Sequence, residues 1–119
     1  MREGPGILLA RLLMASVFVV MGAYRLLMAA EGAAIRNSTL VFSAVELVLG
    51  LLVAIGWKLR LTASLAALLM LADALLSHPF WTLQGTEHGA QLLHFMKNIN
   101  IVGGFLLLAL LAGGKPRRL

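Results

Sequence analysis

Four long apolar stretches divide this 119-residue chain and restrict its fold more than any other feature. They cover residues 7–30, 40–56, 61–76 and 101–112. A bilayer core about 30 Å thick is crossed by about 20 helical residues. Over the whole chain 61% of the residues are apolar and 13% are charged, whereas soluble domains average about 45–50% and about 25%. The sequence therefore predicts a single membrane domain and excludes a water-soluble fold.

The last apolar stretch needs upstream residues to cross a bilayer. Residues 101–112 rise only about 18 Å as a helix, at about 1.5 Å per residue. A spanning helix must include residues 90–98 as well, and its polar side chains must then face protein rather than lipid. We therefore predict an all-α, four-helix transmembrane bundle, with helices over residues 7–30, 40–57, 60–77 and 90–112.

Basic residues are distributed unevenly between the two sides of this predicted bundle. Six lie on the side that holds both termini and the second connection, namely Arg2, Lys58, Arg60, Lys115, Arg117 and Arg118. On the other side Arg36 is the single basic residue. Because Lys and Arg are enriched in cytoplasmic loops, we predict that both termini are cytoplasmic, in the inner membrane of a bacterium.

The first apolar stretch also has features of a cleaved signal peptide, since Arg2 precedes it and Ala29 and Ala30 end it. However, it is longer than a signal-peptide core, it contains Arg11, and three further spans follow. We interpret it as a retained first helix. Arg11, near the cytoplasmic end, is expected to extend its guanidinium to the lipid headgroups.

The composition excludes several kinds of partner and cofactor. A net charge of +5 is compatible with nucleic-acid binding, but the basic residues flank apolar stretches instead of forming one polar face, so no nucleic-acid partner is predicted. The chain contains no cysteine, which excludes thiolate metal sites, iron–sulfur clusters and covalently attached c-type haem. No metal site is predicted.

Polar residues from all four predicted helices fall at a similar depth in the membrane. Counted at about 1.5 Å per residue from the cytoplasmic ends, seven lie about 16–27 Å up: Arg25, Glu46, Asp73, His78, His94, Lys97 and Asn98. A charge at this depth costs about 2.5–3.5 kcal/mol, so such positions are informative. Because Arg25 and Lys97 balance the two acids, we predict an outward-opening polar cavity, closed on the cytoplasmic side by apolar packing.

Helical spacing supports this inward-facing arrangement. Steps of three and four residues align one stripe on each predicted helix: Arg11, Ala15, Phe18, Gly22 and Arg25; Ser43, Glu46, Gly50 and Ala54; Ala66, Met70, Asp73 and Ser77; Gln91, His94, Asn98 and Ile101. Small residues in such stripes, and the pair Gly103 and Gly104, favour close helix contact.

The similar depth of His78 and His94 raises the alternative of a b-type haem with two histidine ligands. We regard this as disfavoured, because His78 ends a helix beside Pro79 and a porphyrin needs a wider gap between helices. A hydrogen-bonding or proton-relay role is favoured over haem, and ordinary interfacial histidines are the other alternative.

Several motifs resemble those of the DoxX family of small membrane proteins. Residues 95–108 resemble the family's last-helix signature, in which an aromatic-x-Lys-Asn segment precedes Gly-Gly and a leucine run. Glu46 with Gly50 resembles the Glu-x-x-x-Gly element of its second helix, and residues 58–60 resemble its basic turn. Arg25 stands where the family usually has Lys, which keeps the charge but replaces a point ammonium with a planar fork.

This resemblance implies a redox-associated membrane subunit, since the family is named for a subunit linked to a thiosulfate:quinone oxidoreductase, although most members have no established activity. In that interpretation Arg25 and Lys97 bind a quinone carbonyl or a small anion, and Glu46 or Asp73 exchanges protons. His78, His94 and Asn98 complete the ligand site, and the catalytic candidates are Glu46, Asp73 and Lys97. A quinone, or a membrane or periplasmic redox partner, would supply the redox chemistry. Oligomerisation is left open.

Two alternatives to a ligand-binding subunit stay open at this point. In the first, the protein is a non-catalytic scaffold or assembly protein whose buried ion pairs only define the fold. In the second, it is an ion channel or proton carrier. The second is disfavoured because the inner halves of the predicted helices, such as residues 105–111, are almost wholly apolar.

Overall fold

The computed structural model describes residues 4–113, and within them the chain is all-α. The elements in chain order are α1 (Pro5–Ala30), α2 (Asn37–Ile55), α3 (Leu59–Ser77), the short 3-10 helix η1 (Phe80–Thr82) and α4 (Gly85–Gly113). Each of the four long helices is apolar and long enough to cross a membrane. This confirms the predicted four-helix transmembrane bundle.

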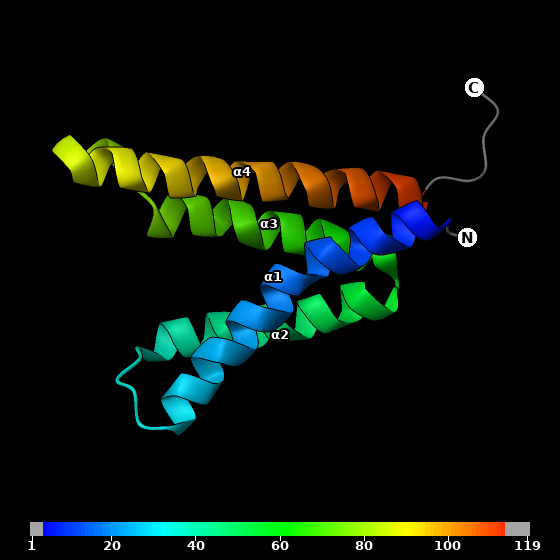
Figure 1. Ribbon diagram of the computed structural model, residues 1–119, viewed down its shortest axis with the longest axis horizontal. Helices are drawn as coiled ribbons and strands as arrows, with labels where there is room; N and C mark the ends of the chain where they lie inside the picture. Colours follow the sequence, from blue (N-terminus) through cyan, green and yellow to red (C-terminus); the bar gives the residue numbers. More distant parts are fainter. Residues whose placement is uncertain (1–3, 114–119) are drawn as a thin grey trace.

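The helix boundaries differ from the predicted ones by a few residues, and most at the start of α4. Residues 85–89, predicted to belong to a connection, form the first turns of α4. Glu87 in this first turn favours the helix, because a negative charge interacts well with the positive N-terminal end of the helix dipole. Figure 1 shows that α4 consequently extends beyond the end of α3.

The α2–α3 turn ends the second helix earlier than predicted. Gly56 adopts the left-handed conformation at φ 80° and its N–H bonds to carbonyls of the last turn of α2. This is a common way to end a helix, because glycine has no Cβ to clash there. Lys58 also has a positive φ, at 41°, which is uncommon for a residue with a side chain. The turn therefore joins the two helices in very few residues.

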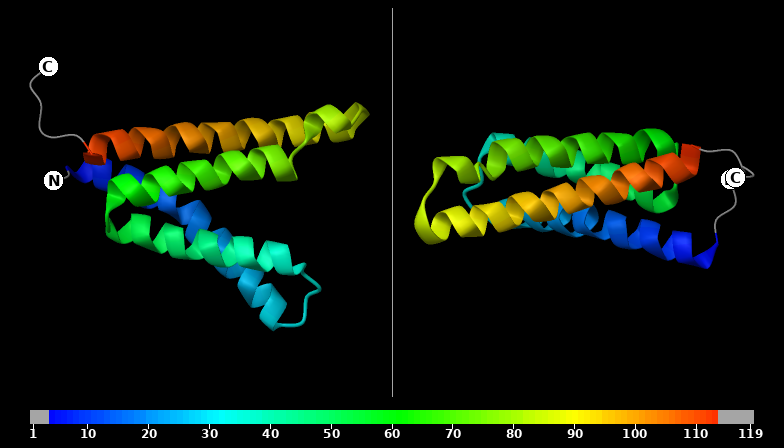
Figure 2. Two further views of the ribbon diagram at one scale, coloured as in Figure 1. Left: turned by 180° about the vertical axis from the view of Figure 1, so that it is seen from behind. Right: turned by 90° about the horizontal axis from the view of Figure 1, so that it is seen from above.

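The four helices are arranged as two antiparallel hairpins that meet at one end and diverge at the other (Figures 1 and 2). One hairpin is formed by α1 and α2, and the other by α3 and α4. The N-terminal end of α1, the α2–α3 turn and the C-terminal end of α4 lie at the end where the hairpins meet. The loop after α1 and η1 lie at the diverging end.

The apolar core lies where the hairpins meet. Its centre is formed by Phe18 of α1 and Phe105 of α4, both fully buried, with ring centroids 5.0 Å apart. Around them pack small and branched side chains, including Val53, Ala66 and Met70. Large apolar side chains on the outer surfaces of all four helices are exposed and suited to contact lipid.

Close contact between α1 and α2 depends on two glycines that lie on the predicted stripes. A Cβ added at Gly22 would lie 2.8 Å from the carbonyl oxygen of Ser43, and one at Gly50 would lie 2.7 Å from Cβ of Phe18. Of the predicted pair on α4, Gly104 faces Met14, whereas Gly103 faces open space. The expectation of close approach therefore holds for Gly104 and is wrong for Gly103.

Arg11 corrects another expectation. Its side chain is buried, at 8% exposure, and does not extend to the lipid headgroups. Nη1 donates hydrogen bonds to the carbonyl oxygens of Val53, at 2.9 Å, and Ala54. These carbonyls belong to the last turn of α2, which lacks helical partners. Arg11 therefore ties α1 to the C-terminal end of α2.

The predicted cytoplasmic location of both termini stays a prediction. Arg2, Lys115, Arg117 and Arg118, on which it partly depends, lie outside the described residues. The described ends of α1 and α4 lie at the same end of the molecule, as an even number of spans requires.

Candidate functional site

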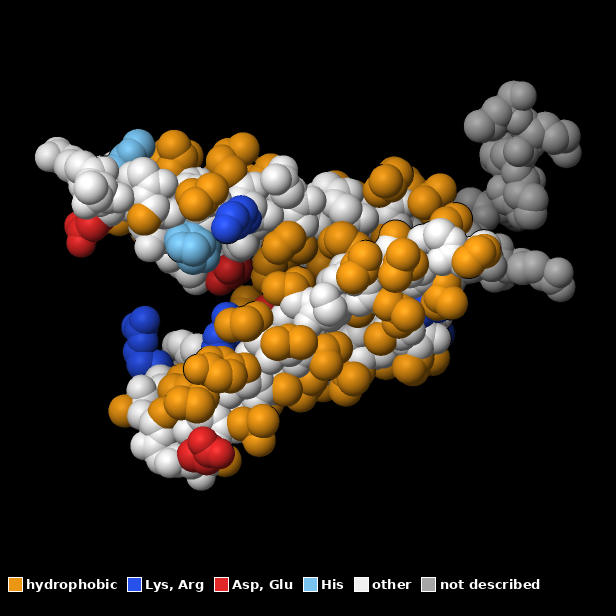
Figure 3. All heavy atoms as spheres, in the orientation of Figure 1, with side chains coloured by type: hydrophobic (Ala, Val, Ile, Leu, Met, Phe, Trp, Pro, Cys, Tyr) orange, Lys and Arg blue, Asp and Glu red, His pale blue; other side chains and the backbone are white. Residues whose placement is uncertain are grey.

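The diverging hairpins leave an open notch between them, visible in the space-filling view (Figure 3). We use "the notch" for this opening at the end of the molecule that holds residues 31–36 and 78–84. Basic, acidic and histidine side chains gather along its two sides, while the surrounding surface is mainly apolar. The polar residues predicted to share one depth supply two clusters here, one on each hairpin.

The first cluster is an ion pair within the α1–α2 hairpin. Nη1 of Arg25 donates to Oε1 of Glu46 at 2.8 Å. The Glu46 side chain is 3% exposed, whereas that of Arg25 is 31% exposed. A carboxylate buried to this degree needs a cation and hydrogen bonds to persist in its ionised form. Arg25 supplies both, and its guanidinium has further N–H groups beyond the one used here.

The second cluster lies between α3 and α4 and is centred on Asp73. Nδ2 of Asn98 donates to Oδ2 of Asp73 at 2.7 Å. Nε2 of His78 lies 3.7 Å from the same oxygen. Asp73 also acts electrostatically on Glu46 of the other hairpin. The two clusters are therefore separate in their hydrogen bonds but coupled through the electric field across the notch.

The contacts of His78 define which of its ring nitrogens carries hydrogen. Nδ1 lies 2.7 Å from Oε1 of Gln91, and with the amide oxygen as acceptor Nδ1 is the donor. In the neutral ring Nε2 then presents a lone pair to the carboxylate of Asp73. A proton at this contact converts two facing acceptors into an ion pair. Asp73 and His78 can thus hold one proton between them at the notch.

The two predicted histidines lie together, but not in an arrangement that fits haem. The His78 and His94 rings stack with centroids 5.3 Å apart and an angle of 28° between their planes. Stacked rings in contact leave no room for a porphyrin between them. His94 is exposed, so the pair connects the Asp73 contact to the surface of α4.

Lys97 does not take the place predicted for it. We expected it to pair with Glu46 or Asp73, but within residues 4–113 no ion pair joins it to either, and its side chain is exposed. Glu46 pairs with Arg25, and the near neighbours of Asp73 are Asn98 and His78. One turn of a helix carries both Lys97 and Asn98, and the helix rotation directs only Asn98 toward α3.

Two residues that we did not predict as site residues belong to this region. Gln91 lies on the predicted stripe of the fourth helix, and that spacing was the signal that could have assigned it to the site. Ser43 is fully buried one turn before Glu46, and within the described residues its hydroxyl has no hydrogen-bond partner. A buried hydroxyl is a site where an ordered water can bind.

Aromatic residues close the end of the α3–α4 hairpin. Phe80 of η1 packs edge-on against Trp81, His88 and Phe95, with centroid distances of 5.2, 5.6 and 5.1 Å. This cluster fixes η1 on α4 and thereby the position of His78 immediately before it. Within residues 4–113 no three His, Asp or Glu side chains converge as a set of metal ligands.

The chain is similar to the inner membrane protein YphA of Escherichia coli (strain K12). The two are 28% identical over 117 residues, which cover 91% of this chain and 84% of YphA. No family model and no solved structure matches the chain. A relative of similar length that is an inner membrane protein agrees with the four membrane-spanning helices described above.

Proposed function

We propose that this protein is a DoxX-like, multi-pass inner-membrane subunit of a redox assembly, and that its notch binds a quinone-type ligand or a small anion. One observation carries the proposal. In a bundle with an otherwise apolar interior, charged and hydrogen-bonding side chains from all four helices collect at the notch. Their placement in the membrane is costly, and residues of this kind usually serve a function.

Each cluster offers a different chemistry to such a ligand. Arg25 is partly exposed at the notch and retains N–H groups that can donate to a carbonyl or anionic oxygen. The exposed ammonium of Lys97 adds a second positive charge on α4. Asp73 and His78 can hold a proton at their 3.7 Å contact. A bound quinone would supply the two-electron chemistry that the side chains of this chain lack.

Ligand binding by the purified protein in nanodiscs tests the proposal. The probes are a short-chain ubiquinone analogue and thiosulfate, each titrated against wild type and the double variant Lys97→Met with Glu46→Gln. We expect the double variant to lose at least about tenfold in affinity for one probe, since each lost charge contact is worth about 1.5–3 kcal/mol. The matched control is Arg36→Gln with Glu87→Gln, which removes one basic and one acidic residue from exposed positions.

The outcome that contradicts the proposal is also defined. If neither probe binds wild type, and native mass spectrometry of the protein purified from its membrane shows no co-purifying quinone, the notch is not a site for these ligands. Equal affinities of wild type and the double variant, with unchanged thermal stability, would contradict the assigned residues.

A scaffold function is the second candidate, and the Arg25–Glu46 pair favours it. This pair is satisfied within one hairpin and nearly buried on its acidic side, as a purely structural pair would be. Under this function Glu46→Gln lowers thermal stability and leaves probe affinity unchanged. The two readouts therefore separate the candidates.

A further inference from the structure

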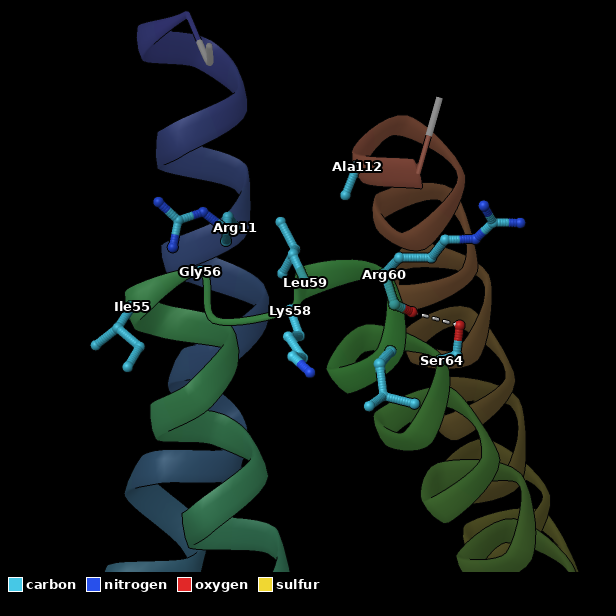
Figure 4. Close-up of a pocket in the computed structure, with 9 residues that line it drawn as sticks. Arg11, Ile55, Gly56, Lys58, Leu59, Arg60, Ser64 and Ala112 are labelled. Carbon is cyan, nitrogen blue, oxygen red and sulfur yellow. Dashed lines mark hydrogen bonds between the residues drawn. The ribbon is translucent and has the colours of Figure 1, made fainter. Parts of the chain in front are cut away.

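A pocket of about 880 Å³ lies at the opposite end of the molecule from the notch. Its floor is the α2–α3 turn, and its walls come from α1, α3 and the end of α4 (Figure 4). Its volume falls within the range of about 300–1,000 Å³ that is typical of small-ligand sites. Nothing in the proposed function of the notch uses this pocket.

The charge of the pocket is of one sign. Among its described lining residues the charged ones are Arg11, Lys58 and Arg60, all basic. Like charges around one cavity repel one another, and the repulsion is strong where water is partly excluded. An anion bound between them would relieve it.

The three basic side chains differ in their freedom to bind an anion. Nη1 of Arg11 already donates to the carbonyls that end α2, so this residue contributes mainly its charge. Lys58 and Arg60 are exposed, and Nζ of Lys58 lies 5.3 Å from the centre of the Trp57 ring. Figure 4 shows Arg11 and Arg60 on opposite walls, with Leu59 between them. Long side chains of this kind can close on a group held above the turn.

The backbone of the turn adds to the attraction. Between them, Gly56 and Lys58 both adopt positive φ and reverse the chain direction sharply before Leu59. The following helix, α3, starts here without a side-chain cap or an acidic residue in its first turn. Its first N–H groups lack helical partners and favour negative charge.

The rim of the pocket is apolar and suits an amphipathic ligand. Ile55 and Leu61 line it and are 72% and 51% exposed. The neighbouring Trp57 is 49% exposed, and tryptophan is enriched at the boundary between the bilayer core and the headgroups. A charged centre beside apolar side chains at this depth matches a phosphate headgroup followed by acyl chains.

We propose that this pocket binds a phosphate group, that Lys58 and Arg60 are its principal ligands, and that an anionic phospholipid is the source the apolar rim favours. The shared chemistry is the phosphate oxygens, which accept hydrogen bonds from ammonium and guanidinium groups. Free phosphate is the other source, and the experiment separates the two.

Native mass spectrometry of lipid-bound protein tests the proposal. The protein in nanodiscs containing phosphatidylglycerol and phosphatidylcholine is released, and the retained lipids are counted for wild type, Arg60→Gln and Lys58→Asn. Asparagine tolerates the positive φ at this position, so the second variant keeps the turn. We expect preferential retention of phosphatidylglycerol by wild type and about a fivefold loss for each variant, since one Lys or Arg contributes about 1 kcal/mol near an anionic surface.

The matched control is Arg36→Gln, which removes one exposed positive charge at the notch end. It should retain as much phosphatidylglycerol as wild type. An equal loss in this control would show general charge attraction and overturn the proposal. Retention of phosphatidylcholine equal to that of phosphatidylglycerol would overturn it too, as would unchanged retention in both pocket variants.

Competition identifies the source of the phosphate. Inorganic phosphate at millimolar concentration is added before release. If it displaces phosphatidylglycerol from wild type, the site is a phosphate site open to soluble ligands. If it does not, the acyl chains are part of what binds. Probe binding at the notch should be unchanged in Arg60→Gln, which separates this inference from the proposed function.

Discussion

The contact between α1 and α2 at Gly22 supports a quantitative prediction for Gly22→Ala. A Cβ at this position would lie 2.8 Å from the carbonyl oxygen of Ser43 and 2.9 Å from the backbone nitrogen of Leu47. Both atoms belong to the backbone of α2 and cannot rotate away, so the helices must separate. Overpacking of this kind costs about 1–3 kcal/mol, and alanine recovers about 1 kcal/mol through its helix propensity. We expect a net loss of up to about 2 kcal/mol.

Gly103→Ala is the matched control, because it makes the same chemical change at a helical position with no atom within 4 Å. Helix propensity contributes equally to both variants, so the difference between them isolates the overpacking, about 1–3 kcal/mol. Equilibrium unfolding in mixed detergent micelles, followed by circular dichroism, measures it. If Gly22→Ala is as stable as Gly103→Ala, close approach of α1 and α2 at Gly22 is refuted.

Three further predictions follow from the polar contacts. Arg11→Met should destabilise the bundle by about 1.5–3 kcal/mol in the same unfolding assay, because it removes charged donors from the carbonyls that end α2; stability equal to wild type would contradict that role. Arg25→Met should be more destabilising than Glu46→Gln, since it leaves a buried carboxylate without its cation, by about 3–5 kcal/mol; the reverse order would contradict the pairing. Asn98→Leu should shift the infrared carboxylate band of Asp73, because it removes the 2.7 Å hydrogen bond, and an unchanged band would contradict that bond.

The positions of the polar residues illustrate how far sequence reasoning reaches here. Counting along the helices brought Arg25, Glu46, Asp73 and Asn98 to one level, and the structure places all four beside the notch. Counting could not assign partners, because depth along a helix says nothing about its rotation relative to a neighbour. Lys97 shows the consequence, since it shares the level but not the contacts predicted for it.

The number of spans and the apolar character of the chain follow from sequence alone, because hydrocarbon thickness sets the length of each apolar helix. The stripe containing Gly22 follows in the same way, from the helical period. Which acid meets which base depends on how the two hairpins pack and diverge, and so does the burial of Arg11 on the end of α2. Those angles arise from contacts between residues far apart in the chain, such as Phe18 and Phe105, and only the folded structure contains them.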